Sequence, residues 1–494
     1  MKATMLRRIP DMLGIFVLTV LGLAVAPRAF GQYQAVFGGA ERDAGTGGII
    51  QVSDASFIAV GWATSFSGDS DVYVVKSDLC GKLLWARTYD IGGNDEGKKI
   101  RETRDGGFII AGVTQNLRTC CPNEEGWTPD EGFLLKITGK GDVEWARTYG
   151  GQDHDDMQDV LPVPGGDGYY AVGRSASFGA GRYDGWLMQV TDLGHVVWSR
   201  TYGEYSRDGL YSLAIGSDSS LIAVGETVSF SPSGSTHQDI FVVKARASDG
   251  ELIWSNYYRA PAAAFAGSIL LDEPVAGDPV FYVAGLVNRN AGTGYDAYIL
   301  KAKYSNGAVL GDVAFHHQVA TSNVDDFREI KKLPTGNLIA VGSLGPAVLL
   351  PDYNYDFYLA EVDQGLAPVW HRAYGGRYYD QGWSVAVGFS PSLRYTLMAL
   401  GFTNSFGFGD LDLYQVYATS AGVSGCNERI PAIDRFVPGL TAMPAEINTS
   451  KVWVECPVKV VVIKDDHGRV LCTDCKSLDD QLNDTEFSEG MMAQ

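Results

Sequence analysis

The amino-acid sequence predicts an all-β protein in which one unit is repeated seven times around a ring, and two observations lead to this prediction. The first is the composition. The 494 residues include 60 glycines and 11% aromatic residues, and short apolar runs alternate with Gly, Asp and Asn, as is typical of strands joined by tight turns. The second is a tandem repeat: Trp-Ala-Arg-Thr-Tyr-Gly at 145–150 returns as Trp-Ser-Arg-Thr-Tyr-Gly at 198–203. A period of roughly 50 to 60 residues is typical of propellers and solenoids.

Three landmarks recur and define the strands of the unit. The first is an apolar strand that ends in glycine, at Gly61, Gly112, Gly173, Gly225, Gly285, Gly342 and Gly401. The second is an acid two residues before an aromatic, at Asp71, Glu131, Asp184, Asp239, Asp296, Asp356 and Asp412. The third is a turn glycine four positions before a tryptophan, at Trp85, Trp145, Trp198, Trp254 and, with one inserted residue, Trp370. Each unit therefore offers four strands, A to D in chain order, and four short antiparallel strands repeated radially predict a seven-bladed β-propeller.

The two ends of the repeat predict how the ring closes. The seventh unit ends at 422–426 without the tryptophan-containing strand D. The segment 33–39, Tyr-Gln-Ala-Val-Phe-Gly-Gly, matches that missing strand. We therefore expect the N-terminal strand to complete the last blade, which removes the open edges of the array.

The repeat motif also carries a resemblance to known proteins. Trp-x-Arg-Thr-Tyr-Gly-Gly, then Asp-Gly-Gly-Phe-Ile-Ile-Ala-Gly at 105–112, then Asp-x-aromatic, resembles the glycine-rich propeller repeats of secreted and surface proteins of bacteria and archaea. The resemblance covers roughly residues 33–425 and implies architecture alone, because that family is mostly of unknown function. The turns before Trp85 and Trp254 more weakly resemble the tryptophan-docking turns of quinoprotein propellers, which implies a tryptophan packed between blades.

Three regions are expected along the chain. Residues 1–31 have the features of a secretory signal peptide, with Arg7 and Arg8 before the apolar run 15–26 and a small-x-small cleavage site at 29–31. Residues 32–425 are the propeller. Residues 426–494 are a C-terminal extension, in which strands at 452–463 and 470–472 are expected to form a small disulfide-linked appendage before a disordered acidic end. The protein is thus expected to be secreted, either extracellular or periplasmic, with no transmembrane segment after the signal.

The cysteines fit an exported protein. Four of the seven lie in the extension, at Cys426, Cys456, Cys472 and Cys475. Two disulfides among them are expected, with zinc binding as the alternative. The Cys-x-x-Cys-Lys at 472–476 also resembles a rare haem attachment site but lacks the following histidine. Cys120 and Cys121 are adjacent in the longest B to C connection and are expected to form a vicinal disulfide, as in the quinoprotein alcohol dehydrogenases that this pair resembles. Cys80 is then expected to be a free thiol.

The head of strand A supplies candidate binding residues. An acid occurs there in six units, at Asp43, Asp95, Asp156, Asp208, Asp325 and Asp380. Strand A lines the channel of a propeller, so these acids are expected to ring one mouth of it. Two roles are open: the acids accept backbone N–H bonds in the preceding turn, or they bind a cation, with calcium at Asp95, Asp156 and Asp208 as the candidate. No other cofactor is expected.

The composition and motifs favour binding over catalysis. A formal net charge of −20 argues against nucleic acid and anionic membranes as partners. No catalytic residue is assigned, because the sequence shows no credible nucleophile elbow, P-loop, Rossmann fingerprint or histidine pair with metal-ligand spacing. We expect a non-enzymatic binding or scaffold module with a protein or glycan partner, and Trp62 and Trp127 are candidate glycan platforms. The alternative is an enzyme on the same ring, either a quinoprotein-like oxidoreductase or a polysaccharide lyase or hydrolase.

Overall fold

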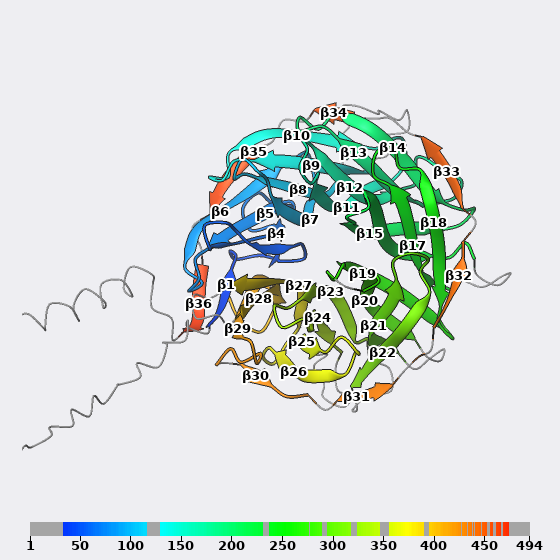
Figure 1. Ribbon diagram of the computed structural model, residues 1–494. Coiled ribbons are helices and arrows are strands. Elements are labelled where there is room, and N and C mark those ends of the chain that lie inside the picture. The colour runs from blue at the N-terminus through cyan, green and yellow to red at the C-terminus, as the bar shows by residue number, and fades with distance from the viewer. Residues whose placement is uncertain are drawn as a thin grey trace, which may run out of the picture.

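The computed structural model describes residues 33–473, apart from 116–128, 231–236, 276, 289–293, 318–323, 346–354, 390–394 and short stretches after 425 (426, 432, 437, 439, 446, 452–454, 458–460 and 466–467). The described residues form seven antiparallel sheets arranged in a ring, so the prediction of a seven-bladed propeller is confirmed (Figure 1). Within these residues no helix is long and apolar enough to cross a membrane.

Each blade contains the strands that the repeat predicts, with strand A nearest the centre. Blade 1 has β2 (Asp43–Ala44), β3 (Ile49–Gln51), β4 (Phe57–Ala63), β5 (Asp71–Ser77) and β6 (Leu83–Asp90). Blade 2 has β7 (Asp95–Glu102), β8 (Phe108–Gln115), β9 (Asp130–Ile137) and β10 (Val143–Tyr149). Blade 3 has β11 (Asp155–Pro162), β12 (Tyr169–Ser175), β13 (Asp184–Val190) and β14 (Val196–Gly203). Blade 4 has β15 (Asp208–Ile215), β16 (Ser220–Thr227), β17 (Asp239–Arg246) and β18 (Leu252–Arg259).

The remaining blades follow the same order. Blade 5 has β19 (Ala263–Asp272), β20 (Val280–Asn288), β21 (Asp296–Lys303) and β22 (Val309–His317). Blade 6 has β23 (Asp326–Lys332), β24 (Leu338–Leu344), β25 (Asp356–Val362) and β26 (Pro368–Tyr374). Blade 7 has β27 (Asp380–Phe389), β28 (Tyr395–Thr403), β29 (Asp412–Thr419) and the N-terminal β1 (Tyr33–Phe37).

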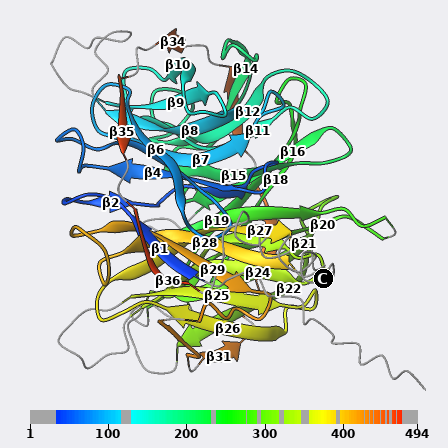
Figure 2. The same cartoon turned by 90° about the vertical axis from the view of Figure 1, so that its left-hand side faces the viewer.

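The N-terminal strand closes the ring as predicted. β1 pairs antiparallel with β29, with Tyr33 opposite Tyr417 and Phe37 opposite Leu413. Tyr33 and Tyr417 also stack, with ring centroids 5.2 Å apart. In the side view of Figure 2, β1 lies beside β29 and β36. The first and last parts of the propeller sequence therefore share one sheet.

The chain after the propeller forms a belt rather than the separate appendage that we expected. It adds one short antiparallel strand to the outer edge of every blade, in the order 6, 5, 4, 3, 2, 1, 7 (Figure 1, orange to red). These belt strands are β30 (Glu428–Arg429), β31 (Ile433–Phe436), β32 (Thr441–Pro444), β33 (Asn448–Lys451), β34 (Glu455–Pro457), β35 (Val461–Asp465) and β36 (Gly468–Thr473). The expected pairing between 452–463 and 470–472 is wrong, because β35 pairs with β6 and β36 with β1. The backbone N–H and C=O groups on the outer edge of each strand D pair with a belt strand.

The Trp-x-Arg-Thr-Tyr motif joins each blade to the next. At five junctions the tyrosine hydroxyl donates to the carbonyl of the turn glycine in the following blade, as from Tyr149 to Gly194 (2.7 Å) and from Tyr258 to Gly307 (2.8 Å). Blades 5 and 7 have phenylalanine at this position, Phe315 and Phe37. Gly194 has a φ of 79°, a conformation that favours glycine. The Trp145 indole N–H likewise donates to the carbonyl of Asp192 (2.9 Å). Hydrophobic clusters fill the junctions between blades, such as the cluster that includes Val60, Val74, Ile100 and Phe133 between blades 1 and 2.

Candidate binding site

The central channel is shaped by a β-bulge in the innermost strand of blades 2 to 7. In each strand the pairing register shifts by one residue, so that one residue is left unpaired. A bulge of this kind redirects the side chain of the extra residue. The six bulged residues are Lys98, Gln158, Tyr211, Gly267, Arg328 and Trp383. All six line one cavity, so the bulges present an asymmetric set of side chains from a repetitive ring.

This cavity, which we call the cup, has a volume of about 470 Å³. It opens on the face that carries the D to A and B to C connections, since Val324 and Tyr295 also line it. Its aromatic residues are Tyr211, Phe265, Tyr295, Phe327 and Trp383. Its charged residues are Lys98, Lys99, Asp326 and Arg328. The lining thus carries three cations and one carboxylate, the opposite balance to the chain as a whole, whose formal net charge is −20.

Arg328 and Trp383 pack against each other at one corner of the cup. The Arg328 guanidinium lies 3.8 Å from the centre of the Trp383 ring, and its Nη2 is 2.8 Å from Oδ2 of Asp326. This packing holds the indole ring and the guanidinium against each other at the wall of the cup. Arg328 Nη1 and Trp383 Nε1 have no hydrogen-bond partner among the described residues. Two donors at this corner therefore lack an acceptor.

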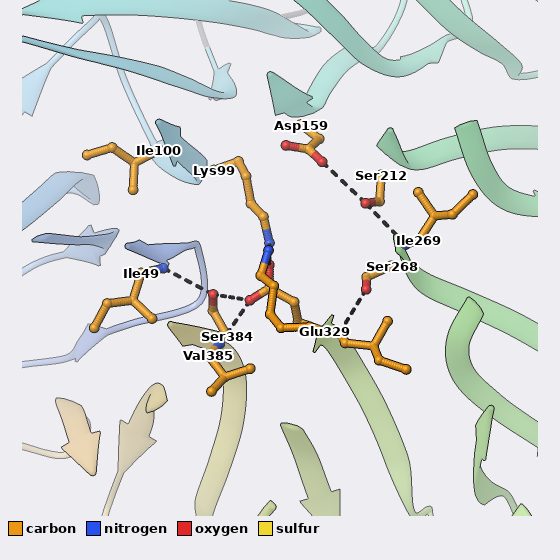
Figure 3. A network of polar contacts seen from close by, with 12 residues as sticks. Ile49, Lys99, Ile100, Asp159, Ser212, Ser268, Ile269, Glu329, Ser384 and Val385 are labelled. Carbon is orange, nitrogen blue, oxygen red and sulfur yellow. Dashed lines mark hydrogen bonds and ion pairs between the residues drawn. The ribbon is translucent and has the colours of Figure 1, made fainter. Parts of the chain in front are cut away.

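An ion pair between Lys99 and Glu329, which together with Lys331 we call the plug, spans the channel and closes the floor of the cup. Lys99 Nζ from blade 2 lies 2.7 Å from Oε1 of Glu329 from blade 6 (Figure 3). Lys331 Nζ binds the same oxygen at 3.0 Å. Arg101 pairs with Asp159 at 2.9 Å beside them. Below this plug lies a second hollow of about 290 Å³, lined by Arg101 and Lys331 among others.

The residue after each bulge forms a polar collar that links neighbouring blades. In blades 3 to 7 its side chain accepts a hydrogen bond from a backbone N–H of the following blade, as from Ile330 to Ser268 (3.0 Å) and from Ile49 to Ser384 (3.0 Å) (Figure 3). Glu329 accepts the N–H of Val385 at 2.9 Å in the same way. In blade 2 the residue is Lys99, whose ammonium donates to Glu329 instead. The collar satisfies backbone groups that the bulges free from pairing. It therefore holds the innermost strands in place under the cup.

The charges of the plug are set by burial and by each other. Burial alone would raise the pKa of Glu329, but the ammonium groups of Lys331 and Lys99 outweigh burial and hold that pKa below its ordinary value. Burial lowers the pKa of Lys331, and the Glu329 carboxylate opposes this shift. Glu329 is therefore ionised at neutral pH, so the floor of the cup is a charged plug rather than an apolar one.

The acids predicted at the head of strand A lie between blades and hold turns. Asp95 accepts the N–H of Ile91 at 2.5 Å, and the equivalent bonds run from Gly39 to Asp43, Glu204 to Asp208, His317 to Asp325 and Gly376 to Asp380. None of them is among the described residues that line the cup. Burial raises the pKa of Asp95 to about 8 and that of Asp325 to about 7. The turn-holding role is observed directly, and a metal-binding role stays a prediction.

In blade 3 the predicted acid is displaced by one position. Asp155, not Asp156, lies at the head of the strand: it is opposite Ser175 and accepts the N–H of Gly151 at 2.8 Å. Asp156 instead binds the Arg174 Nε at 2.8 Å. The A to B turn of blade 3 is longer than that of blade 2, because β11 ends at Pro162 and β12 begins only at Tyr169. Counting back from Gly173 therefore reached the wrong residue.

Among the other predicted site residues, those that the structure describes do not line the cup. Trp62 is half-buried and packs with Ala44, Phe402 and Leu411. Trp127, Cys120, Cys121, Cys426 and Cys475 lie outside the described residues. Cys456 and Cys472 belong to the belt strands β34 and β36, and their pairing stays a prediction.

The prediction that Cys80 is a free thiol is wrong. Cys80 is disulfide-bonded in the structure. The prediction assigned the other six cysteines to one another, which left Cys80 alone. A belt that returns to every blade brings the tail within reach of the ring.

The residues that line the cup were not predicted from the sequence, although the sequence contains a signal of their position. Strand A is the irregular, partly polar strand of each unit, and the bulged residue lies three positions after the strand-head acid in most blades, as Lys98 does after Asp95 and Trp383 after Asp380. That position varies while its surroundings repeat. A variable position inside a repeat marks a surface that the architecture does not constrain.

Comparisons with known proteins show limited similarity. No family model matches the chain. A segment of 115 residues, 22% of this chain, is 28% identical to the Regulatory protein FlaEY of Caulobacter vibrioides and spans only 12% of that protein. A protein of unknown function from Dyadobacter fermentans is similar with a TM-score of 0.41 and 11% identity, over 79% of this chain and 99% of that one. The mannose phosphorylase MPT-4 of Leishmania mexicana has a TM-score of 0.30 and 11% identity, over 65% of this chain and 82% of that one. These similarities assign no ligand to the cup.

Proposed function

We propose that this protein is an exported, non-enzymatic binding module that holds an acidic glycan in the cup. The observation that carries the proposal is the lining itself, in which aromatic faces and cations converge from different blades of an acidic protein. Sugar rings present apolar C–H faces that pack on aromatic side chains, and their hydroxyls need polar partners. A sugar that carries a carboxylate adds a group that Arg328 and Lys98 are suited to bind, because arginine matches the geometry of a carboxylate.

The size of the cup supports a small or terminal unit of a larger glycan. A volume of about 470 Å³ falls in the range of roughly 300 to 1,000 Å³ that is typical of small-molecule sites. The plug of Lys99 and Glu329 ends the cup from below. A glycan would therefore enter by one end and leave the rest of its chain on the open face.

The chemistry of the lining favours binding over hydrolysis. Glycoside hydrolysis ordinarily uses two carboxyl groups on opposite sides of the scissile bond. Among the described residues of the cup, Asp326 is the only acid, and it is already paired with Arg328. No second carboxylate lines the described part of the cup, and Glu96 and Glu329 beside it are paired with Lys98 and Lys99.

The proposal is tested by screening the secreted form against neutral and carboxylated glycans, followed by calorimetry on the best binder. Trp383→Ala is expected to weaken binding at least tenfold, about 1.4 kcal/mol, through loss of a ring face. Arg328→Gln is expected to weaken carboxylated glycans more than neutral ones. Tyr205→Ala is the matched control, because Tyr205 is an aromatic residue that is 71% exposed and outside the cup.

Three results would contradict the proposal. One is a screen in which no glycan binds the wild-type chain. The other is a glycan whose affinity is unchanged in Trp383→Ala and Arg328→Gln, or is lost in Trp62→Ala instead, since the binding site would then lie elsewhere on the ring. Binding of a protein partner at the cup without any glycan would also overturn it.

A further inference from the structure

The residue that follows the motif tyrosine, or the phenylalanine that replaces it in blades 5 and 7, faces carboxylates at the junction between blades. In four blades it is glycine, at Gly38, Gly150, Gly203 and Gly375. A methyl group on Gly203 would come within 1.9 Å of Asp184 Oδ1 and 2.7 Å of Asp208 Oδ2. A methyl group on Gly38 would come within 2.4 Å of Asp412 Oδ1. Any side chain at this position therefore points at the acids.

Two other blades place a basic side chain at this position. Arg259 in blade 4 lies 3.1 Å from Asp239 Oδ2. His316 in blade 5 lies 2.6 Å from Asp296 Oδ1. Blade 6 obtains the same effect from the belt, where Arg429 contacts Asp356. A positive group at this junction is thus a recurring solution to the burial of acids.

Blade 1 departs from this pattern, because the position is occupied by a third acid, Asp90. Carboxylate oxygens of Asp71, Asp90 and Asp95 all lie within 4.8 Å of one another. Asp71 and Asp95 are fully buried, with 0% exposure. Both carboxylate oxygens of Asp71 and Oδ1 of Asp95 have no hydrogen-bond partner among the described residues. Asp71 and Asp95 therefore bring buried carboxylate oxygens without hydrogen-bond partners to a cluster between β5 and β7.

We propose that Asp71, Asp90 and Asp95 bind one calcium ion between blades 1 and 2. The ligands are all carboxylate oxygens, which calcium prefers and which suit soft metals poorly. An ion here would supply the positive charge that Arg259 and Arg429 supply in blades 4 and 6. It would also join strand C of blade 1 to strand A of blade 2. This site is distinct from the cup and does not depend on the proposed glycan.

The protonation of the cluster agrees with this geometry. Burial, with a contribution from Asp90, raises the pKa of Asp71 to about 6, and burial, with Asp71, raises that of Asp95 to about 8. Burial and the neighbouring Asp69 also raise the pKa of Asp90. Without an ion, part of the cluster therefore carries protons near neutral pH. Calcium has to displace them, so its affinity is expected to rise with pH.

The test is calcium titration of the chelator-treated full chain, followed by calorimetry and thermal unfolding. The wild type is expected to bind calcium at this site and to unfold at a higher temperature with it. Asp90→Gly copies the residue found in four other blades, so the variant is expected to fold. It should lose one calcium per chain or bind it at least tenfold more weakly. Asp71→Asn is a second variant with the same expectation.

Asp153→Gly is the matched control. Asp153 is exposed on the same face of the ring and outside the cluster, and its replacement should leave calcium binding unchanged. The proposal is overturned if the wild type binds no calcium, or if Asp90→Gly and Asp71→Asn bind it as the wild type does. A failure of glycan binding has no bearing on this test, because the titration uses calcium alone.

Discussion

The ring and the belt of this protein are held together by different kinds of contact. Blades of the ring are joined by specific side chains, such as the Tyr149 hydroxyl on the carbonyl of Gly194, and by buried clusters of apolar residues at each junction. The belt is joined mainly by backbone pairing along strand D of each blade. A few belt side chains add to this, as where Leu440 is buried against blade 5.

This difference explains why the ring repeats in sequence and the belt does not. A side-chain contact that recurs around the ring requires the same residue type in every blade that makes it, as the tyrosine contact does at five junctions. Backbone pairing with an open strand edge constrains the residue types much less. The belt strands are also short, from two residues in β30 to six in β36, so the new outer edge exposes little pairing surface.

Removal of the belt is expected to have the largest effect on the stability of the protein. A chain that stops at Gly425 keeps β1 and the ring but exposes the outer edge of all seven blades. We expect it to aggregate, or to unfold at least roughly 10 °C lower, because many backbone hydrogen bonds of about 0.5 to 1.5 kcal/mol each are lost. The measurements are thermal unfolding and light scattering.

The matched control for this truncation stops at Thr473, after the last belt strand. It should behave like the full chain. If the chain that stops at Gly425 is monomeric and as stable as this control, the belt contributes nothing to the ring, and the comparison fails.

An intermediate effect is expected at the end of the belt. β36 pairs with β1, and the hydroxyl of Tyr33 in β1 lies 3.5 Å from the carbonyl of Asp78, in the turn that carries Cys80. We therefore expect the partner of Cys80 to be a cysteine of the tail, such as Cys472. Cys80→Ser should destabilise the chain by about 2 to 4 kcal/mol and make the last belt strands more sensitive to protease.

Peptide mapping without reduction identifies the partner directly. A bridge from Cys80 to Cys120 or Cys121 would show that the disulfide does not fasten the belt. Asp78→Asn offers a control in the same turn that leaves the cysteine in place.

The architecture of the ring could be predicted because its determinants are local and repeated. Glycine at the strand ends, the strand-head acids and the tyrosine motif each recur with the blade, so their spacing fixed the number of blades and the closing strand Tyr33–Phe37. The belt could not be predicted in this way. Its partners are strand edges up to several hundred residues away, and its own sequence carries no matching pattern, as between Val461 and Asp90.

The candidate site was predictable only in part, for a related physical reason. The strand order led us to the face with the D to A and B to C connections, on which the cup opens. The binding residues on that face were sought among repeated positions such as Asp95 and Asp208. Repeated acids turned out to hold turns. The cup is formed by bulged residues such as Arg328 and Trp383. Their side-chain types differ from blade to blade, so a search for repeated residues passes over them.

The smallest effect is expected from the loss of one tyrosine hydrogen bond between blades, which we call a clamp. Tyr149→Phe removes the hydroxyl that donates to Gly194 at 2.7 Å and leaves the aromatic packing of this fully buried ring in place. The loss should be about 1 kcal/mol, because one net hydrogen bond disappears and one carbonyl loses its partner. Tyr205→Phe is the control, since Tyr205 is 71% exposed, and its stability should match the wild type. Chemical unfolding of both variants measures the difference. A loss of more than about 3 kcal/mol for Tyr149→Phe would mean that one clamp holds the ring as strongly as the belt does, whereas no loss would mean that the motif joins the blades by packing alone.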